Sequence, residues 1–308
     1  MTKRATREAF GETLIELCEQ GLDVVAVDAD LAGSTTTGKL GAYDPDRLIE
    51  VGIAEQDMMG VAAGLSLTGR IPFTASFAVF GTGRCYDQIR NTVCDSNLNV
   101  KICPTHAGIT VGEDGATHQM LEDISLMRTL PQMRVLVPAD YWSAKAAIRI
   151  AAETEGPVYV RMGRHKVPEV YDENFKGGLG YAHVLREGTD VSIMACGVEV
   201  AQALEAADLL AKKGISAEVV DVFSIKPLDE EIILASAKKC GRVVTCEEHM
   251  IRGGLGSAIA EFLSAKHPVP MHYIGMDSFG TSAPGDVLVE HFGLDAASIA
   301  KTVEEFLD

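Results

Sequence analysis

The amino-acid sequence predicts an α/β protein made of two consecutive doubly wound domains, of which the second is the smaller. Short apolar runs rich in β-branched residues alternate with amphipathic helical patterns along almost the whole chain. One polar, glycine-rich stretch at 168–181 interrupts this alternation and shows neither the helical nor the strand period. The 308 residues are enough to bury two cores. We therefore expect a first domain at 1–167, a linker at 168–181 and a second domain at 182–308.

The first domain is expected to begin with a helix, because apolar residues recur at helical spacing between Ala9 and Leu17 and Gly21 ends the run. Strand-like runs follow at 23–30, 48–52, 71–77, 100–106, 134–140 and 157–163. Helical patterns separate them, the clearest at Gln56–Thr68, Gly83–Cys94 and Tyr141–Glu153. Strands that are apolar along their whole length indicate a parallel sheet covered on both faces.

The second domain repeats the alternation. Its strand-like runs are "DVSIMACG", "ISAEVVDVFSI", "RVVTCEEH" and "VPMHYIG", with helical patterns at 198–213, at 229–238, from Leu255 and at the C-terminus. The run "IRGGLGSAIAEF" lacks the G-x-G-x-x-G spacing, so close strand–helix packing is expected rather than anion binding. Cys246, Glu247 and His249 would be a poor set of metal ligands.

The charge and the cysteines narrow the class of protein. The net charge is −17 and the isoelectric point about 4.9, which disfavours nucleic acid and anionic membranes as partners. An anionic substrate would therefore need placed arginines. No apolar run approaches the roughly 20 residues of a membrane span, and charges interrupt the N-terminus too often for a signal peptide. The seven cysteines contain no C-x-x-C pair, which predicts free thiols and a cytoplasmic location.

Polar and aromatic residues follow the predicted strands of the first domain. In doubly wound sheets, ligands bind at the edge where the carboxyl ends of the strands meet. The residues expected at that edge are Asp28, Asp30, Ser34, Glu55, Phe77, Phe80, His106 and Arg161. Loops that follow strands are often polar in any case, but convergence from five strands favours a site.

The segment "HAGITVGEDGATHQ" (106–119) is too polar for a strand and too rich in glycine for a helix, which predicts a loop. Its His106, Asp114 and His118 could serve a metal site, acid–base chemistry or merely a turn. The spacings between them do not follow a standard zinc pattern, so a metal site is disfavoured. Imidazoles titrate in the range that proton transfer needs, which favours acid–base and hydrogen-bonding roles.

Three segments together resemble the transketolase family: "VGIAEQDMMGVAAGL" (51–65), the F-x-x-F of "SFAVFGTGRCYDQIR" (76–90), and the loop at 106–119. Many thiamine-diphosphate enzymes share "GIAEQ", whereas the loop is more specific to transketolases. The resemblance covers essentially the whole chain, as a pyrimidine-binding domain followed by a C-terminal domain. It implies thiamine diphosphate as cofactor and transfer of a two-carbon ketol unit between sugar phosphates, as in the pentose phosphate pathway.

One family element is missing. Transketolase-type enzymes bind the cofactor diphosphate and its metal through a "GDG" and a later asparagine in an N-terminal domain, whereas this chain has only "EDG" at 113–115. The resemblance therefore implies the C-terminal subunit of a split transketolase. An N-terminal partner subunit would hold Mg²⁺ or Ca²⁺ and the diphosphate, and the two would assemble into a heterotetramer. A fragment of a longer enzyme is the alternative.

Glu55 is the expected activating residue. In the family, a glutamate contacts a ring nitrogen of the aminopyrimidine and promotes loss of the thiazolium proton. The alternative is a glutamate that only interacts with the dipole at the start of a helix. By the same resemblance, Phe77 stacks on the pyrimidine and Phe80 supports it, although core packing is the default for both. Asp30 would line the cofactor side of the pocket.

The resemblance also assigns substrate contacts. His118 would contact the donor carbonyl, Asp114 a sugar hydroxyl, and His106 the acceptor or its phosphate. We expect His118 and His106 to be catalytic, because ketol transfer moves a proton when the carbon–carbon bond breaks.

Phosphate binding would come from Arg7 and Arg161, which match phosphate-binding arginines of the family, with Ser34 beside them. Arg164 and His165 are weaker candidates. For Arg7, an exposed charge on an N-terminal helix is the alternative.

Other readings of the chain are half of a deoxyxylulose-phosphate synthase-like enzyme, half of a ketoacid-dehydrogenase-like enzyme, or a non-catalytic regulatory subunit. His106 argues against the synthase, and the lack of an "HSQ"-type element argues against the dehydrogenase. The presence together of Glu55, His106, Asp114 and His118 argues against a silent subunit.

Overall fold

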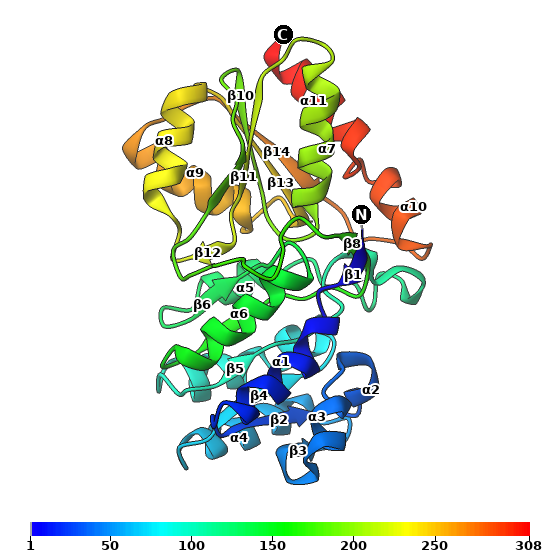
Figure 1. The fold of residues 1–308 in the computed structure, drawn as a ribbon, viewed down its shortest axis with the longest axis vertical. Helices are drawn as coiled ribbons and strands as arrows, with labels where there is room; N and C mark the ends of the chain where they lie inside the picture. The colour runs from blue at the N-terminus through cyan, green and yellow to red at the C-terminus, as the bar shows by residue number, and fades with distance from the viewer. Residues whose placement is uncertain (1) are drawn as a thin grey trace.

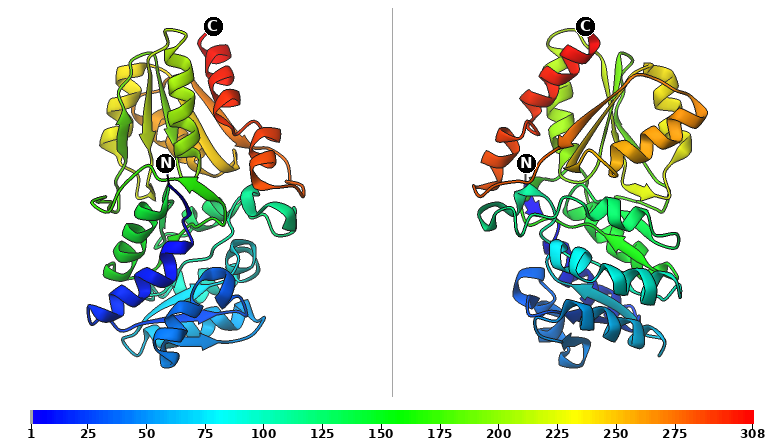
Figure 2. Two further views of the ribbon diagram at one scale, coloured as in Figure 1. Left: turned by 45° about the vertical axis from the view of Figure 1, so that its right-hand side comes forward. Right: turned by 180° about the vertical axis from the view of Figure 1, so that it is seen from behind.

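A computed structural model describes residues 2–308 and shows two sheet-centred domains, one above the other along the long axis of the molecule (Figures 1 and 2). Each domain carries helices on both faces of its sheet. The predicted α/β fold of two consecutive parallel-sheet domains is therefore confirmed.

The elements of the first domain alternate as the sequence indicates. They are β1 (Lys3–Ala5), α1 (Glu8–Glu19), β2 (Val24–Asp28), α2 (Ala32–Thr35), α3 (Gly38–Tyr43), η1 (Pro45–Arg47), β3 (Leu48–Glu50), α4 (Glu55–Ser66), β4 (Ile71–Ala75), η2 (Val79–Arg84), η3 (Gln88–Cys94), β5 (Lys101–Ile102), η4 (Ile109–Asp114), α5 (Asp123–Arg128), β6 (Arg134–Leu136), α6 (Tyr141–Glu153), β7 (Val158–Val160) and β8 (Lys166–Pro168).

The second domain continues with β9 (His183–Arg186), β10 (Val191–Ala195), α7 (Glu199–Ala211), β11 (Ala217–Asp221), β12 (Ser224–Lys226), α8 (Glu230–Cys240), β13 (Val243–Met250), α9 (Leu255–Lys266), β14 (Met271–Met276), α10 (Gly285–His291) and α11 (Ala296–Leu307). Its five-stranded sheet has the order β14-β13-β10-β11-β9, in which only β9 is antiparallel to its neighbour. Helices α7 and α11 lie on one face and α8 and α9 on the other (Figure 1). No helix in the described part of the chain is long and apolar enough to cross a membrane.

The first sheet is buried on both faces, as the continuous apolar strands require. Its seven strands have the order β12-β6-β7-β5-β4-β2-β3. In β2, Val24 and Ala26 pack into the core formed with α1 and α6, whereas Val27 packs into the core formed with α4 and η3. The alternation along a strand thus serves two apolar layers.

The run "ISAEVVDVFSI" is predicted as one strand, but the structure divides it. β11 remains in the second sheet, whereas β12 joins the first sheet antiparallel to β6, with Ser224 opposite Leu136. Between them, the fully buried Phe223 packs into the core of the first domain, which draws the chain across. Every other strand of the seven-stranded sheet precedes residue 168. With β12 as the one exception among the described strands, we propose a first domain at 1–167, a linker at 168–181 and a second domain at 182–308.

The single helix predicted at Gly83–Cys94 is also replaced by another structure. The chain forms two wider π-helical turns, η2 and η3, interrupted at 85–87. The hydroxyl of Thr82 bonds the Ala78 carbonyl, and the thiol of Cys85 points at the carbonyls of Phe80 and Gly81. π-Helical turns are frequent at functional sites. Here, η2 places Phe80 and Arg84 near the start of α4.

Candidate active site

The buried carboxylate of Asp28, at the carboxyl end of β2, builds one wall of the site. It accepts hydrogen bonds from the Leu31 amide at 2.7 Å, the Thr35 hydroxyl at 2.7 Å and the Thr37 hydroxyl at 2.8 Å. Burial raises the pKa of Asp28, and these donors oppose the rise. The sequence "DADLAGSTTT" (28–37) thereby folds back on itself as a loop that contains the short helix α2.

This loop holds Arg7. The Thr36 hydroxyl donates to the carbonyl of Arg7 at 3.0 Å, and Nη1 of Arg7 donates to the Ser34 carbonyl at 2.6 Å. Nη1 also lies 3.4 Å from Nε2 of His106, while the buried Nε has no partner among the described residues. These contacts hold the guanidinium of Arg7 in position, and its Nε remains available to donate a hydrogen bond. Arg7 is therefore not simply an exposed charge on the protein surface.

His106 follows β5 and lies almost fully buried, with a relative exposure of 3%. Its imidazole stacks on the ring of Phe77, with centroids 3.8 Å apart, and its Nδ1 lies 2.7 Å from the Thr105 hydroxyl. Its φ of +61° is in the left-handed region, which a non-glycine residue rarely adopts. In this strained backbone conformation, Nε2 of His106 points toward Arg7.

Arg164 completes a positive cluster at the substrate loop, which we define as residues 106–119. Its Nη1 donates to the Val111 carbonyl at 2.8 Å and lies 3.3 Å from Oδ2 of Asp114. Burial, and after it the charges of Arg7 and Arg164, lower the pKa of His106 to about 3. In a chain with a net charge of −17, this cluster is a local exception suited to an anion.

We expect Arg164→Ala to raise the pKa of His106, because one of the two charges that disfavour the imidazolium is removed. Burial remains, so the pKa should stay below the ordinary value of 6.5. The measurement is an NMR titration of the labelled imidazole. The same shift should make the native chain lose stability as the pH falls from about 6.5 toward 3, because only the unfolded chain binds the proton there. Titration of His106 near 6.5 in the unmodified chain would contradict this prediction.

Phe77, Phe80 and His118 form an aromatic group beside this cluster. The rings of Phe77 and Phe80 are nearly parallel, with centroids 6.2 Å apart. The His118 ring meets Phe80 edge-on at 5.4 Å and Phe77 at 6.5 Å. Nδ1 of His118 lies 2.9 Å from the Thr117 hydroxyl, and its Nε2 makes no hydrogen bond among the described residues. The substrate loop and the F-x-x-F segment are therefore one site.

Glu55 begins α4 and is buried, with 3% exposure. Its Oε1 accepts a hydrogen bond from Nη1 of Arg84 at 2.8 Å, and the Arg84 guanidinium lies 4.4 Å above the ring of Phe80. Sequence reasoning missed Arg84 as a site residue. The available signal was its position four residues after Phe80, which places both on one side of a helical turn.

Arg161 does not lie at the proposed phosphate site, contrary to our expectation. Its side chain is 6% exposed, its Nε donates to Asp123 at 2.7 Å and its Nη2 donates to the Glu248 carbonyl at 2.8 Å. Although burial alone would lower it, Asp123 and Glu248 raise the pKa of Arg161. The strand that precedes Arg161 ends facing the second domain, so the contacts of Arg161 join the two domains. Arg164 occupies the position beside the other candidate phosphate-binding residues that we expected for Arg161.

Asp30 and Ser34 lie on the loop after β2, as expected. The Asp30 side chain is exposed, its φ is +62° and its amide donates to Glu50 at 3.0 Å. Ser34 faces Arg7 through its carbonyl and not, in this structure, through its hydroxyl. Within residues 2–308, no group of three or more His, Cys, Asp or Glu side chains is arranged to hold a metal.

Residues 2–169 match the transketolase pyrimidine-binding domain and residues 180–299 match the transketolase C-terminal domain. The chain belongs to the transketolase family. It is 47% identical over 306 residues to a putative transketolase C-terminal section of Methanocaldococcus jannaschii, covering 98% of this chain and 96% of that one. It is 40% identical to a subunit of the apulose-4-phosphate transketolase of Phocaeicola vulgatus, covering 98% and 97%.

A solved structure described as a split gene transketolase, inactive beta4 tetramer, is 47% identical, with a TM-score of 0.91 over 99% of both chains. The present chain thus corresponds to the C-terminal section of a transketolase, and its similarity extends to a split-gene enzyme. The family implies thiamine diphosphate and a divalent metal as cofactors.

Proposed function

We propose that the chain supplies the activating glutamate and the substrate-binding residues of a transketolase that transfers a two-carbon ketol unit between sugar phosphates. The observation that carries this proposal is the continuous arrangement of Glu55, the aromatic group and the cluster of His106, Arg7 and Arg164 along one edge of the sheet. A buried carboxylate, a flat aromatic surface and an anion-binding end follow one another in the order that such a reaction needs.

The residues beside α4 fit the aminopyrimidine half of thiamine diphosphate. Phe77 and Phe80 offer ring faces, and Glu55 offers a buried carboxylate close to them. When bound, the cofactor supplies a nucleophilic carbon for attack on the donor ketone. We propose that Glu55 holds a proton shared with the pyrimidine ring, that Phe77 and Phe80 orient that ring, and that Asp30 lines the outer wall of the pocket.

The phosphate end is proposed to consist of Arg7, Arg164 and His106, with Ser34 beside them. Two guanidiniums around a neutral imidazole can bind a dianion through charge-assisted hydrogen bonds. His106 then acts as a neutral imidazole rather than as a cation, which its lowered pKa indicates.

His118 is proposed to move the proton at the reacting sugar carbons. It belongs to the aromatic group, between the proposed cofactor side and the proposed phosphate end. Asp114, which is exposed and contacts Arg164, is proposed to bind a sugar hydroxyl. His118 and His106 therefore have separate roles, one in proton transfer and one in holding the acceptor.

The partner is proposed to be an N-terminal subunit that holds the diphosphate and Mg²⁺ or Ca²⁺, and the two chains are proposed to form a heterotetramer in the cytoplasm. The substrate class of sugar phosphates is supported by the Phocaeicola vulgatus relative, whose name gives apulose 4-phosphate as its sugar. A role in the pentose phosphate pathway is the corresponding metabolic proposal.

The test is reconstitution. The isolated chain should show no ketol transfer from a ketose phosphate to an aldose phosphate, and addition of the partner, thiamine diphosphate and magnesium should restore it. The description of the similar solved tetramer as inactive supports this expectation. Turnover by the isolated chain, in material free of partner, would show that the split-subunit proposal is wrong.

A further inference from the structure

The substrate loop receives a contact from the second domain that the proposed chemistry does not use. The Thr110 amide donates to Oε1 of Glu248 at 2.6 Å, across 138 residues of sequence. Glu248 belongs to β13 and is 2% exposed. The neighbouring Gly108 has φ +86°, and a Cβ added there would lie 2.1 Å from the Glu248 carboxyl carbon. The backbone of the loop therefore packs directly against the carboxylate of Glu248.

Glu248 is itself fixed from two sides. Its carbonyl accepts from Nη2 of Arg161 at 2.8 Å, and its Oε2 lies 3.9 Å from Nη1 of the same arginine. Burial raises the pKa of Glu248, while Arg161 and the donors of Thr110 lower it. Displacement of this buried carboxylate would leave the Thr110 amide unpaired, which disfavours movement of the Glu248 side chain.

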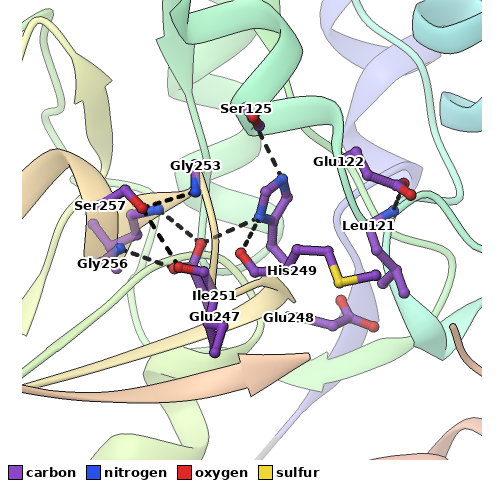
Figure 3. A network of polar contacts seen from close by, with 12 residues as sticks. Leu121, Glu122, Ser125, Glu247, Glu248, His249, Ile251, Gly253, Gly256 and Ser257 are labelled. Atoms are coloured by element: carbon purple, nitrogen blue, oxygen red, sulfur yellow. Dashed lines mark hydrogen bonds and ion pairs between the residues drawn. The ribbon is translucent and has the colours of Figure 1, made fainter. Parts of the chain in front are cut away.

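The preceding residue provides an internal comparison. Glu247 is equally buried, but its carboxylate accepts from the amides of Leu255 and Gly256 at 2.7 and 2.9 Å, at the start of α9. The two side chains point to opposite sides of the strand (Figure 3). Glu247 therefore serves its own domain, whereas Glu248 reaches the other one.

The position of Thr110 affects the candidate active site through neighbouring residues of the loop. Val111, next in sequence, holds Arg164 through its carbonyl, and His106 lies four residues before Thr110. Gln119, near the end of the loop, is held in turn by the Thr281 carbonyl of the second domain at 2.9 Å.

We infer that Glu248 is a positioning residue through which the second domain sets the substrate loop, and with it Arg164, for binding of the phosphorylated substrate. The inference rests on the proposed function for the identity of that substrate. The second domain then contributes to substrate binding without touching the substrate. Glu248 acts on the backbone of the loop, and the loop places the charged groups.

The experiment compares Glu248→Ala, Glu248→Gln and the matched control Glu247→Gln. By hydrogen-exchange mass spectrometry of the 308-residue chain, Glu248→Ala should speed exchange of amides 108–114 about tenfold or more, and Glu248→Gln, which still accepts from Thr110, should restore most of the protection. Glu247→Gln should loosen the start of α9 and leave the loop unchanged.

In the reconstituted enzyme, Glu248→Ala should raise KM for a phosphorylated acceptor about tenfold or more, whereas Glu247→Gln should leave KM within about twofold. Unchanged exchange at 108–114 in Glu248→Ala, or equal loosening of the loop by Glu247→Gln, would overturn the inference. The exchange measurement does not depend on activity, so failure of the proposed function can be distinguished from failure of this role.

Discussion

Glu55→Gln is expected to slow deuterium exchange at the thiazolium carbon of the bound cofactor by about 100-fold or more in the reconstituted enzyme. Glutamine is almost isosteric with glutamate, so the buried position at the start of α4 can be kept. Its amide cannot hold the shared proton, and it also leaves Arg84 without its anionic partner. The exchange rate, followed by NMR after rapid quenching, measures activation before any sugar binds.

The control separates activation from a simple helix-dipole role. Asp57 lies in the same first turn of α4, but its side chain is exposed. Asp57→Asn should cost a comparable, small amount of helix stabilisation and leave the exchange rate unchanged. Equal rates in Glu55→Gln and the unmodified enzyme would assign Glu55 to the helix alone.

His118→Ala should lower kcat by about 100-fold or more, because it removes the group placed where protons move. Arg164→Ala is the contrasting variant, since a phosphate contact made equally in the ground and transition states changes affinity and not turnover. Loss of one charge-assisted hydrogen bond, about 1.5–3 kcal/mol, corresponds to roughly a 10- to 150-fold rise in KM. Steady-state kinetics with phosphorylated and unphosphorylated acceptors measures both.

The unphosphorylated acceptor decides the assignment. It should be nearly indifferent to Arg164→Ala and as sensitive to His118→Ala as the phosphorylated acceptor is. If Arg164→Ala impaired both acceptors equally, its role would instead be to hold the loop through Val111 and Asp114.

The sequence was sufficient for the alternation of strands and helices, because strands buried on both faces must be apolar along their whole length. It did not reveal that "ISAEVVDVFSI" crosses between sheets, since the burial of Phe223 in the first domain is a tertiary event that no local period reports. The π-helical turns were missed for a similar reason. They depend on side-chain to backbone bonds at Thr82 and Cys85.

The site was predictable where motifs carry it. Glu55, Phe77, Phe80, His106 and His118 lie together as the motif spacing suggested, although their roles remain predictions. Arg161 was wrong as a site residue, because sequence fixes the end of a strand more readily than the direction of the side chain that follows. Arg164, three residues later, was only a weaker candidate from the sequence, and its contacts favour it over Arg161.

Strand β12 follows the linker in sequence but pairs in the sheet of the first domain, and this pairing makes the first domain dependent on the second. A chain ending in the linker would leave the β6 edge with unpaired amides and carbonyls and the pocket of Phe223 unfilled. Such an edge is a template for pairing with other chains, so the shortened protein should aggregate rather than form a monomeric domain. The two family domains can be recognised separately in the sequence, but in the folded chain the sheet of the first domain is completed only by β12, which follows the linker.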